Sequence, residues 1–151
     1  MTRVDFYHLE RGSVEDVLPK LLEKAYDCGK AIVVKVGNEV RVEVLSTALW
    51  TYDDQSFLPH GTKKDGNAAL QPIWLTSGND NPNNAKMLFL VDGALTSVDD
   101  LMKFERVFNL FDGKDKEGLE RARVLWKEVK SSGSDCFYWQ QDESGRWQQK
   151  A

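Results

Sequence analysis

The chain has 151 residues, of which 41% are hydrophobic and 29% charged, a balance typical of a soluble globular protein and not of a disordered one. Its net charge of -4 excludes a uniformly basic surface, so contact with nucleic acid requires a local basic face or a protein intermediary. No apolar run is long enough to cross a membrane, no secretory signal is recognisable, and two cysteines are too few for a disulfide framework or a zinc site. We expect a cytosolic protein that forms a single domain over residues 1–151.

Apolar spacing predicts most of the secondary structure. In chain order we expect a strand over 4–9, a helix over 13–28, a strand over 30–36, a helix over 38–50, strands over 72–75 and 87–91, a short helix from 97, a strand over 106–111 and a helix over 115–131. Pro19 lacks a backbone N–H, which predicts that the regular part of the first helix begins near Asp16. Residues 38–50 also fit a strand, but we favour a helix because the segment is long and Asn38 can cap it.

The predicted strands are apolar on both faces and alternate with helices, which indicates a mostly parallel sheet covered on both sides. We therefore expect an α/β fold with three layers, α/β/α, and a Rossmann-like topology. The tail over 136–149 fits either two short strands around Ser144-Gly145 or an aromatic extension. The eleven glycines include no Gly-x-Gly pair and no Gly-Lys-Ser/Thr, so a phosphate-binding glycine-rich loop is missing and we expect no cofactor.

Two Asp-Gly pairs, Asp92-Gly93 and Asp112-Gly113, end buried strands. Acids at the carboxyl ends of neighbouring parallel strands can hold Mg²⁺, so one alternative is a Mg²⁺-dependent phosphoryl or nucleotide enzyme that uses Asp92 and Asp112. We favour the alternative in which each Asp shapes a tight turn, because Asp-Gly is among the commonest turn pairs.

The other reactive side chains form no recognisable constellation. Neither His8 nor His60 has a partner at catalytic or ligand spacing, and Cys28 and Cys136 lack a paired base. We therefore expect no catalytic residue and no metal site, and we interpret His60 as a hydrogen-bonded loop residue.

The helix over 115–131 carries the most informative surface. Arg123, Lys127 and Lys130 surround Trp126, which is three residues from Arg123 and four from Lys130. A large indole beside a guanidinium and two ammonium groups suits an acidic peptide that ends in an aromatic residue and a free carboxylate. A solvated helix face whose Trp packs on the sheet edge fits these residues equally well. Direct binding of nucleic acid through this helix is a further alternative, which the net negative charge disfavours.

A second candidate surface lies where a helix passes into a loop. Trp50 and Phe57 flank a polar stretch there, and such aromatics are either lids over the core or interface anchors.

The order of these motifs along nearly the whole chain resembles the chi subunit family of bacterial DNA polymerase III. The resemblance is carried by Phe6-Tyr7-x-Leu9, Leu21-x-x-x-Ala25, Gly29-Lys30, Ala48-Leu49-Trp50, Ser56-Phe57-Leu58-Pro59-His60, Asn109-Leu110-Phe111-Asp112-Gly113 and Ala122-Arg123-x-x-Trp126-Lys127.

This resemblance implies an α/β fold without an active site of its own. Members of that family link the clamp-loader complex to single-stranded-DNA-binding protein by docking the acidic, Phe-terminated tail of that protein. The tail-binding residues of the family match Arg123, Trp126 and Lys127, and the residues that contact the psi subunit match Trp50 and Phe57. The resemblance therefore implies a non-catalytic replication accessory subunit whose contact with DNA is mainly indirect.

Overall fold

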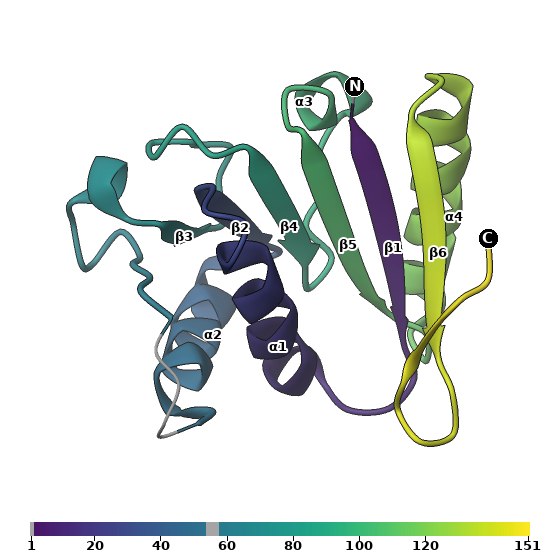
Figure 1. Ribbon diagram of the computed structural model, residues 1–151, viewed down its shortest axis with the longest axis horizontal. Helices are drawn as coiled ribbons and strands as arrows, with labels where there is room; N and C mark the ends of the chain where they lie inside the picture. Colours follow the sequence, from purple (N-terminus) through teal and green to yellow (C-terminus); the bar gives the residue numbers. More distant parts are fainter. Residues whose placement is uncertain (1, 54–57) are drawn as a thin grey trace.

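The computed structural model describes residues 2–53 and 58–151, which form a seven-stranded sheet with helices on both faces (Figure 1). In chain order the elements are β1 (Arg3–Leu9), α1 (Val14–Tyr26), β2 (Ile32–Val36), α2 (Glu39–Thr51), the 3-10 helix η1 (Ala68–Leu70), β3 (Ile73–Thr76), β4 (Met87–Val91), α3 (Val98–Leu101), β5 (Arg106–Asp112), α4 (Lys116–Ser131), β6 (Asp135–Gln141) and β7 (Trp147–Gln149). Among the described helices, none combines the length and the apolar character that crossing a bilayer requires.

The strands lie in the order β3-β2-β4-β5-β1-β6-β7, and all neighbours are parallel except β7, which is antiparallel to β6. Helices α1 and α2 lie on one face of the sheet, and α3 and α4 lie on the other (Figure 1). The predicted α/β fold with a mostly parallel sheet between two helical layers is confirmed.

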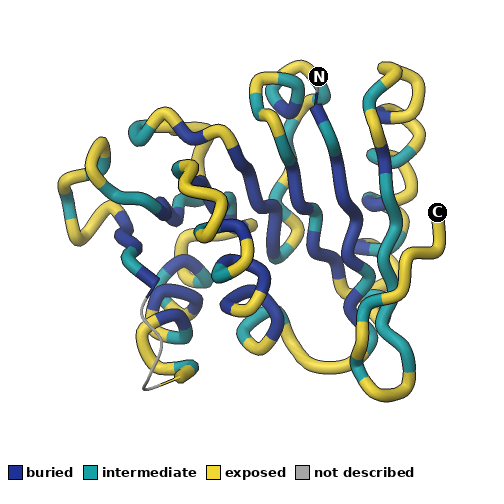
Figure 2. Tube along the Cα trace, in the orientation of Figure 1, coloured by how far each residue is buried: buried dark blue, intermediate teal, exposed yellow. Residues whose placement is uncertain are grey.

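Each face of the sheet has its own hydrophobic core, and the buried strands between the two cores appear in Figure 2. The first core joins α1 and α2 to the sheet and contains, among others, Leu18, Leu22, Val34, Leu45 and Phe89. The second joins α3 and α4 to the sheet and contains, among others, Phe6, Leu90, Leu101, Val107 and Val129. Burial on both faces is the reason that these strands are continuously apolar.

Helix α1 begins at Val14, and the prediction that it begins near Asp16 is wrong. The backbone N–H of Ser13 donates to Asp16 Oδ2 at 3.1 Å, and this contact secures the first turn of the helix. Pro19 lies inside the helix and is buried, so its missing N–H leaves one backbone position of the helix without a bond while its ring packs into the core.

Residues 38–50 and the tail over 136–149, for which the sequence pattern allowed two interpretations each, both have regular structure. Residues 39–51 form helix α2, and Asn38 caps it by accepting a hydrogen bond from the Arg41 backbone N–H at 3.0 Å. The tail forms the two strands β6 and β7, and the turn between them uses Gly145 at φ 84°. Because β6 also pairs with β1, the tail completes the sheet and is not an isolated extension.

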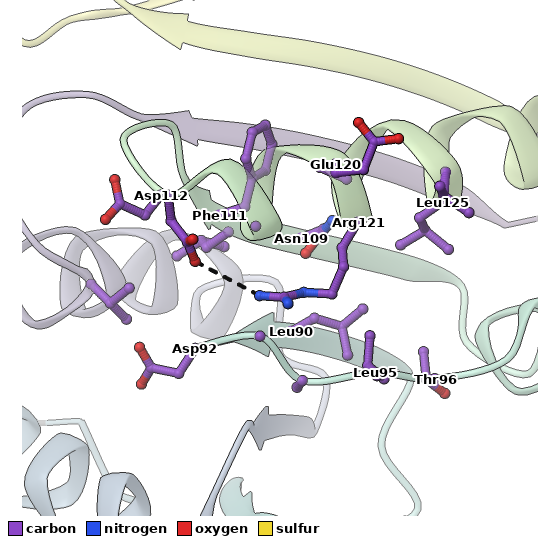
Figure 3. Close-up of a pocket in the computed structure, with 18 of the residues that line it drawn as sticks. Leu90, Asp92, Leu95, Thr96, Asn109, Phe111, Asp112, Glu120, Arg121 and Leu125 are labelled. Atoms are coloured by element: carbon purple, nitrogen blue, oxygen red, sulfur yellow. Dashed lines mark ion pairs between the residues drawn. The ribbon is translucent and has the colours of Figure 1, made fainter.

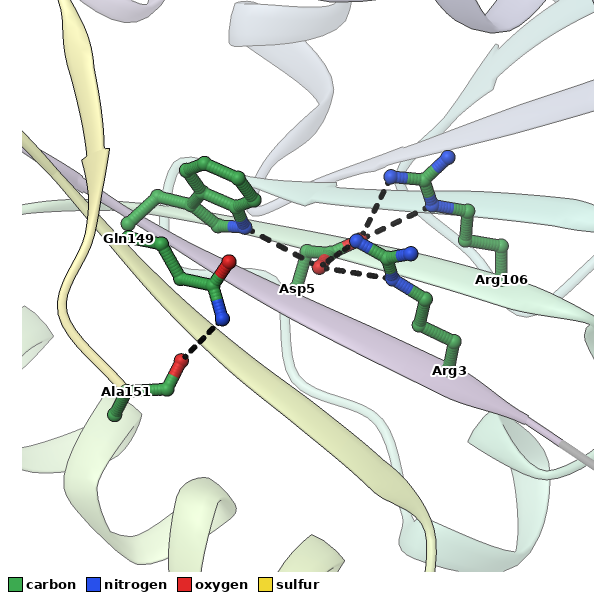
Figure 4. Close-up of polar contacts among 6 residues, drawn as sticks. Arg3, Asp5, Arg106, Gln149 and Ala151 are labelled. Atoms are coloured by element: carbon green, nitrogen blue, oxygen red, sulfur yellow. Dashed lines mark hydrogen bonds and ion pairs between the residues drawn. The ribbon is translucent and has the colours of Figure 1, made fainter.

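A buried carboxylate joins three neighbouring strands (Figure 4). Asp5 on β1 is fully buried and accepts hydrogen bonds from Arg3 at 3.1 and 3.2 Å and from Arg106 on β5 at 2.9 and 3.0 Å. The indole N–H of Trp139 on β6 also donates to it, at 3.3 Å. Each guanidinium lies over a phenylalanine ring, Arg3 over Phe137 at 4.3 Å and Arg106 over Phe108 at 4.5 Å. The charge of Asp5 is therefore compensated inside the sheet.

We predict that Asp5→Asn lowers the free energy of unfolding by about 2–4 kcal/mol, because an amide cannot accept from both guanidinium groups and carries no charge. Urea unfolding followed by circular dichroism measures this loss. The control is Asp135→Asn on the exposed start of β6, which should change stability by less than about 0.5 kcal/mol. Equal losses in the two variants would contradict the role of Asp5.

Candidate functional site

Helix α4 has two chemically different flanks on either side of its buried stripe. Ala122 and Val129 pack against the sheet, with 4% and 0% of their surface exposed. At 3.6 residues per turn, one flank presents basic side chains and an aromatic ring, and the other presents acidic and aliphatic side chains. The first, which we name the basic flank, consists of Arg123, Trp126, Lys127 and Lys130. The second, the acidic flank, consists of Glu117, Glu120, Val124, Leu125 and Glu128 together with one cation, Arg121, which lies 3.8 Å from Glu117.

Trp126 is the centre of the basic flank. Its ring meets Phe6 edge-on at 5.2 Å and Tyr138 at 5.9 Å between ring centroids, so one side of the indole rests on the sheet. The Nζ atom of Lys130 lies 5.1 Å from the centroid of the same ring. The indole is half-buried, and it combines packing on the sheet edge with a place beside a cation.

The remaining basic side chains of this flank point into solvent. Arg123 has 67% of its side chain exposed, and its single ion pair with the described residues, to Glu120, is long at 3.9 Å. An exposed pair of this length contributes little stability, so the guanidinium can be recruited by another carboxylate. Lys127 and Lys130 form no ion pair with the described residues. The flank therefore offers three cations around one indole.

Two further residues adjoin this flank that the sequence analysis did not assign to it. The Nδ1 atom of His8 and the hydroxyl of Tyr138 are joined by a hydrogen bond of 2.6 Å. Burial raises the pKa of Tyr138, and the positive charge of Arg123 opposes this shift in part. Both residues reach the flank because Phe6 pairs in register with Tyr138, and this pairing of β1 with the tail has no signal in the local sequence.

The two strand-end aspartates have distinct local roles. Asp112 accepts a hydrogen bond from the Lys114 backbone N–H at 2.9 Å, which closes the turn into α4. Asp92 adopts a positive φ of 52° and accepts a hydrogen bond from Arg41 at 2.9 Å. Among residues 2–53 and 58–151, no group of three or more His, Cys, Asp or Glu side chains could hold a metal ion. The contact to Lys114 fits the turn interpretation of Asp112-Gly113. For Asp92-Gly93 the positive φ of Asp92 and the hydrogen bond from the Ala94 N–H to the Val91 carbonyl oxygen at 3.1 Å fit it.

The second candidate surface lies on α2. Trp50 is 51% exposed, and its ring lies 4.3 Å from the ring of His60, which is itself buried. His60 is a hydrogen-bonded loop residue, as predicted, with its Nδ1 atom 2.8 Å from the Leu58 carbonyl oxygen. Val40 and Val44 on the same helix are also exposed, at 76% and 41%. Phe57, the other predicted member of this surface, lies outside the described residues.

Comparison with known proteins shows to which family the chain belongs. The profile of the family described as DNA polymerase III chi subunit, HolC, matches residues 1–136. The chain belongs to the chi subunit family. It is 30% identical over 157 aligned positions to the probable DNA polymerase III subunit chi of Rickettsia prowazekii (strain Madrid E), covering 97% of this chain and 91% of that protein. It is 29% identical over 113 positions to DNA polymerase III subunit chi of Pseudomonas aeruginosa, covering 73% and 77%.

The matched region of this chi-family protein extends from the N-terminus to the start of β6. It includes all four residues of the basic flank together with Trp50 and Phe57, and Tyr138 follows just beyond it. The family is one of replication accessory subunits, so protein-binding surfaces are the features to expect on this fold.

The turn beside the basic flank yields a steric prediction. A Cβ atom on Gly113 would lie 1.8 Å from Nε2 of His8, so Gly113→Ala must displace the imidazole and should cost about 1–3 kcal/mol of stability. Thermal unfolding of Gly113→Ala, His8→Ala and the double variant measures this clash. We expect the double variant to be more stable than the sum of the two single losses implies, and strict additivity would contradict the contact.

Proposed function

We propose that this chi-family protein is a non-catalytic accessory subunit that links the clamp-loader complex to single-stranded-DNA-binding protein by docking its acidic C-terminal tail. The observation that carries this proposal is the basic flank of α4, where Lys130 lies beside a half-buried indole and the solvent-exposed Arg123 and Lys127 occupy the same side of the helix. Contact with DNA is then mainly indirect, which agrees with a net charge of -4.

Each part of such a tail has a chemical counterpart on the flank. The ring of the terminal phenylalanine packs beside Trp126, whose other side is held by Phe6 and Tyr138. The terminal carboxylate pairs with the guanidinium of Arg123, which exchanges its long contact to Glu120 for a closer one. Acidic residues upstream of the phenylalanine lie near Lys127 and Lys130. Because these charges are exposed, the affinity should fall as the salt concentration rises.

We predict that Arg123→Ala weakens binding of the tail peptide by about tenfold or more, since a charged hydrogen bond to the terminal carboxylate is lost. Calorimetric titration with the tail peptide of the cognate single-stranded-DNA-binding protein, at low and moderate salt, measures the effect. The matched control is Arg121→Ala, because Arg121 lies on the same helix but faces Asp115 and Glu117 at 3.8 Å on the other side.

An unchanged tail affinity in Arg123→Ala would contradict the assignment of the basic flank, and so would an equal loss in Arg121→Ala. A tail peptide that lacks its terminal phenylalanine tests the contact with Trp126 separately. It should bind Trp126→Ala and the unaltered protein with similar, weak affinity, because both changes remove the same ring contact.

We also propose that α2 forms the interface with the clamp-loader psi subunit or its equivalent, through Trp50 and Phe57. The exposed ring of Trp50 supports this proposal, since exposed tryptophan side chains are common anchors of protein interfaces. Val40 and Val44, one turn apart on the same helix, add exposed aliphatic surface.

We predict that Trp50→Ala weakens association with the psi subunit by at least tenfold, because an interface tryptophan commonly contributes about 2 kcal/mol or more to binding. Titration of the purified psi subunit with each variant measures this. Leu70→Ala is the control, because Leu70 is also apolar and 81% exposed but lies on η1, away from α2. A full-strength complex with Trp50→Ala would contradict the proposal.

A further inference from the structure

A crevice lies along the acidic flank of α4 (Figure 3), and its lining includes no residue of the basic flank. It has a volume of about 620 Å³ and lies between α4 and the connection from β4 to α3, at the carboxyl ends of β4 and β5. In open α/β sheets this is the region where ligands commonly bind. Neither the family comparison nor the proposed tail docking uses it.

The lining of the crevice is aliphatic at its floor and at its rim. Leu90 on β4 forms part of the floor and is 1% exposed, whereas Leu95 and Val124 at the rim are 68% and 48% exposed. Leu125 lies across from Leu95 (Figure 3). Leu95 and Val124 do not pack into either hydrophobic core, so their exposure is not needed for folding. A side chain of a bound ligand that entered the crevice would bury them.

Asn109 adds a polar group to this apolar floor. It pairs with Leu90 in the register of β4 and β5, lines the crevice, and lies beside Arg121 in Figure 3. Its side-chain amide forms no hydrogen bond with the described residues. An amide of this kind has both a donor and an acceptor available, which is what the backbone of a bound peptide requires.

The charges around the crevice are mainly negative. Its lining includes five carboxylates and two arginines: Asp92, Asp112, Asp115, Glu120 and Glu128 against Arg41 and Arg121. Arg41 is held by Asp92 at 2.9 Å, and Arg121 lies 3.8 Å from Asp115. Asp112 and Glu128 form no ion pair with the described residues. An acidic ligand is therefore repelled here, while a basic one finds carboxylates at both ends of the crevice.

We propose that this crevice docks a short basic amphipathic segment of a partner protein. An aliphatic side chain of the segment inserts between Leu95 and Leu125, its backbone bonds to the Asn109 amide, and its Lys or Arg side chains pair with Asp112 and Glu128. From Asp115 to Glu128 the helix rises about 20 Å, which matches roughly six residues of extended chain. Helix α4 then separates two partners of opposite charge, and this second surface does not depend on tail docking.

The probe is an eight-residue peptide, Lys-Leu-Leu-Lys-Lys-Leu-Leu-Lys, acetylated and amidated at its ends and carrying a fluorophore, with a twin in which glutamate replaces every lysine. Fluorescence anisotropy measures binding to the full chain. Nuclear magnetic resonance of the Asn109 side-chain amide reports whether the crevice is occupied. We expect the basic peptide to bind and to shift the Asn109 resonance, and the acidic twin to do neither.

Two variants and a control distinguish binding of the basic peptide in the crevice from its nonspecific electrostatic attraction to a negatively charged protein. Leu95→Lys should weaken binding of the basic peptide about tenfold or more, because it removes apolar contact and adds a like charge. Glu128→Lys should weaken it about threefold to tenfold. The control is Glu143→Lys, which makes the same change of net charge on the exposed turn between β6 and β7 and should have little effect.

Binding that is unchanged in Leu95→Lys, an equal loss in Glu143→Lys, or an Asn109 resonance that does not move would each overturn the proposal. Leu95→Lys should bind the acidic tail peptide as the unaltered protein does, because its change lies on the other flank of α4. Failure of this proposal is therefore distinguishable from failure of tail docking, which the titrations of Arg123→Ala and Trp126→Ala with the tail peptide address.

Discussion

The position of β1 between β5 and β6 is the constraint on which the arrangement of the surfaces depends. From β1 the chain runs outward through β2 to the edge strand β3 and then returns through β4 and β5 to β6. Because crossovers between parallel strands are right-handed, the outward helices α1 and α2 lie on one face and the returning helices α3 and α4 on the other. The buried Asp5 carboxylate ties β1 to its two neighbours through Arg106 and Trp139.

Helix α4 has exposed flanks because α3, its neighbour on that face, has only four residues. A longer neighbour would cover the acidic flank and fill the crevice beside Leu95. On the other side, the tail strand β6 brings Tyr138 against Trp126. One helix thus presents an aromatic surface with positive charge and an aliphatic surface with negative charge. Like charges repel at either surface, so an acidic ligand is disfavoured at the acidic flank and a basic ligand at the basic flank.

Several elements followed from local sequence. The cap of α2 by Asn38, the turn that Asp112 closes and the turn from Val91 to Ala94 depend on neighbours two or three residues away, and these features agree with the sequence analysis. The start of α1 was not predicted correctly. The hydrogen bond from the Ser13 N–H to Asp16 holds the first turn from Val14 onward, although Pro19 provides no backbone donor further along the helix. The partners of Trp126 on the sheet could not be predicted, since they come from β1 and from the tail, far apart in sequence. The crevice was missed for the same reason.

By itself, the sequence determined the α/β class, the family resemblance and the grouping of Arg123, Lys127 and Lys130 around Trp126 on α4, because helical periodicity places these residues without help from the rest of the chain. Only the tertiary structure decided what each flank faces. The order of the strands turned the basic flank toward β6 and Tyr138, and it turned the acidic flank toward the β4–α3 connection and the side-chain amide of Asn109. The surroundings of each flank depend on pairing between strands that are distant in the sequence. No local sequence pattern determines which strands pair or in which register.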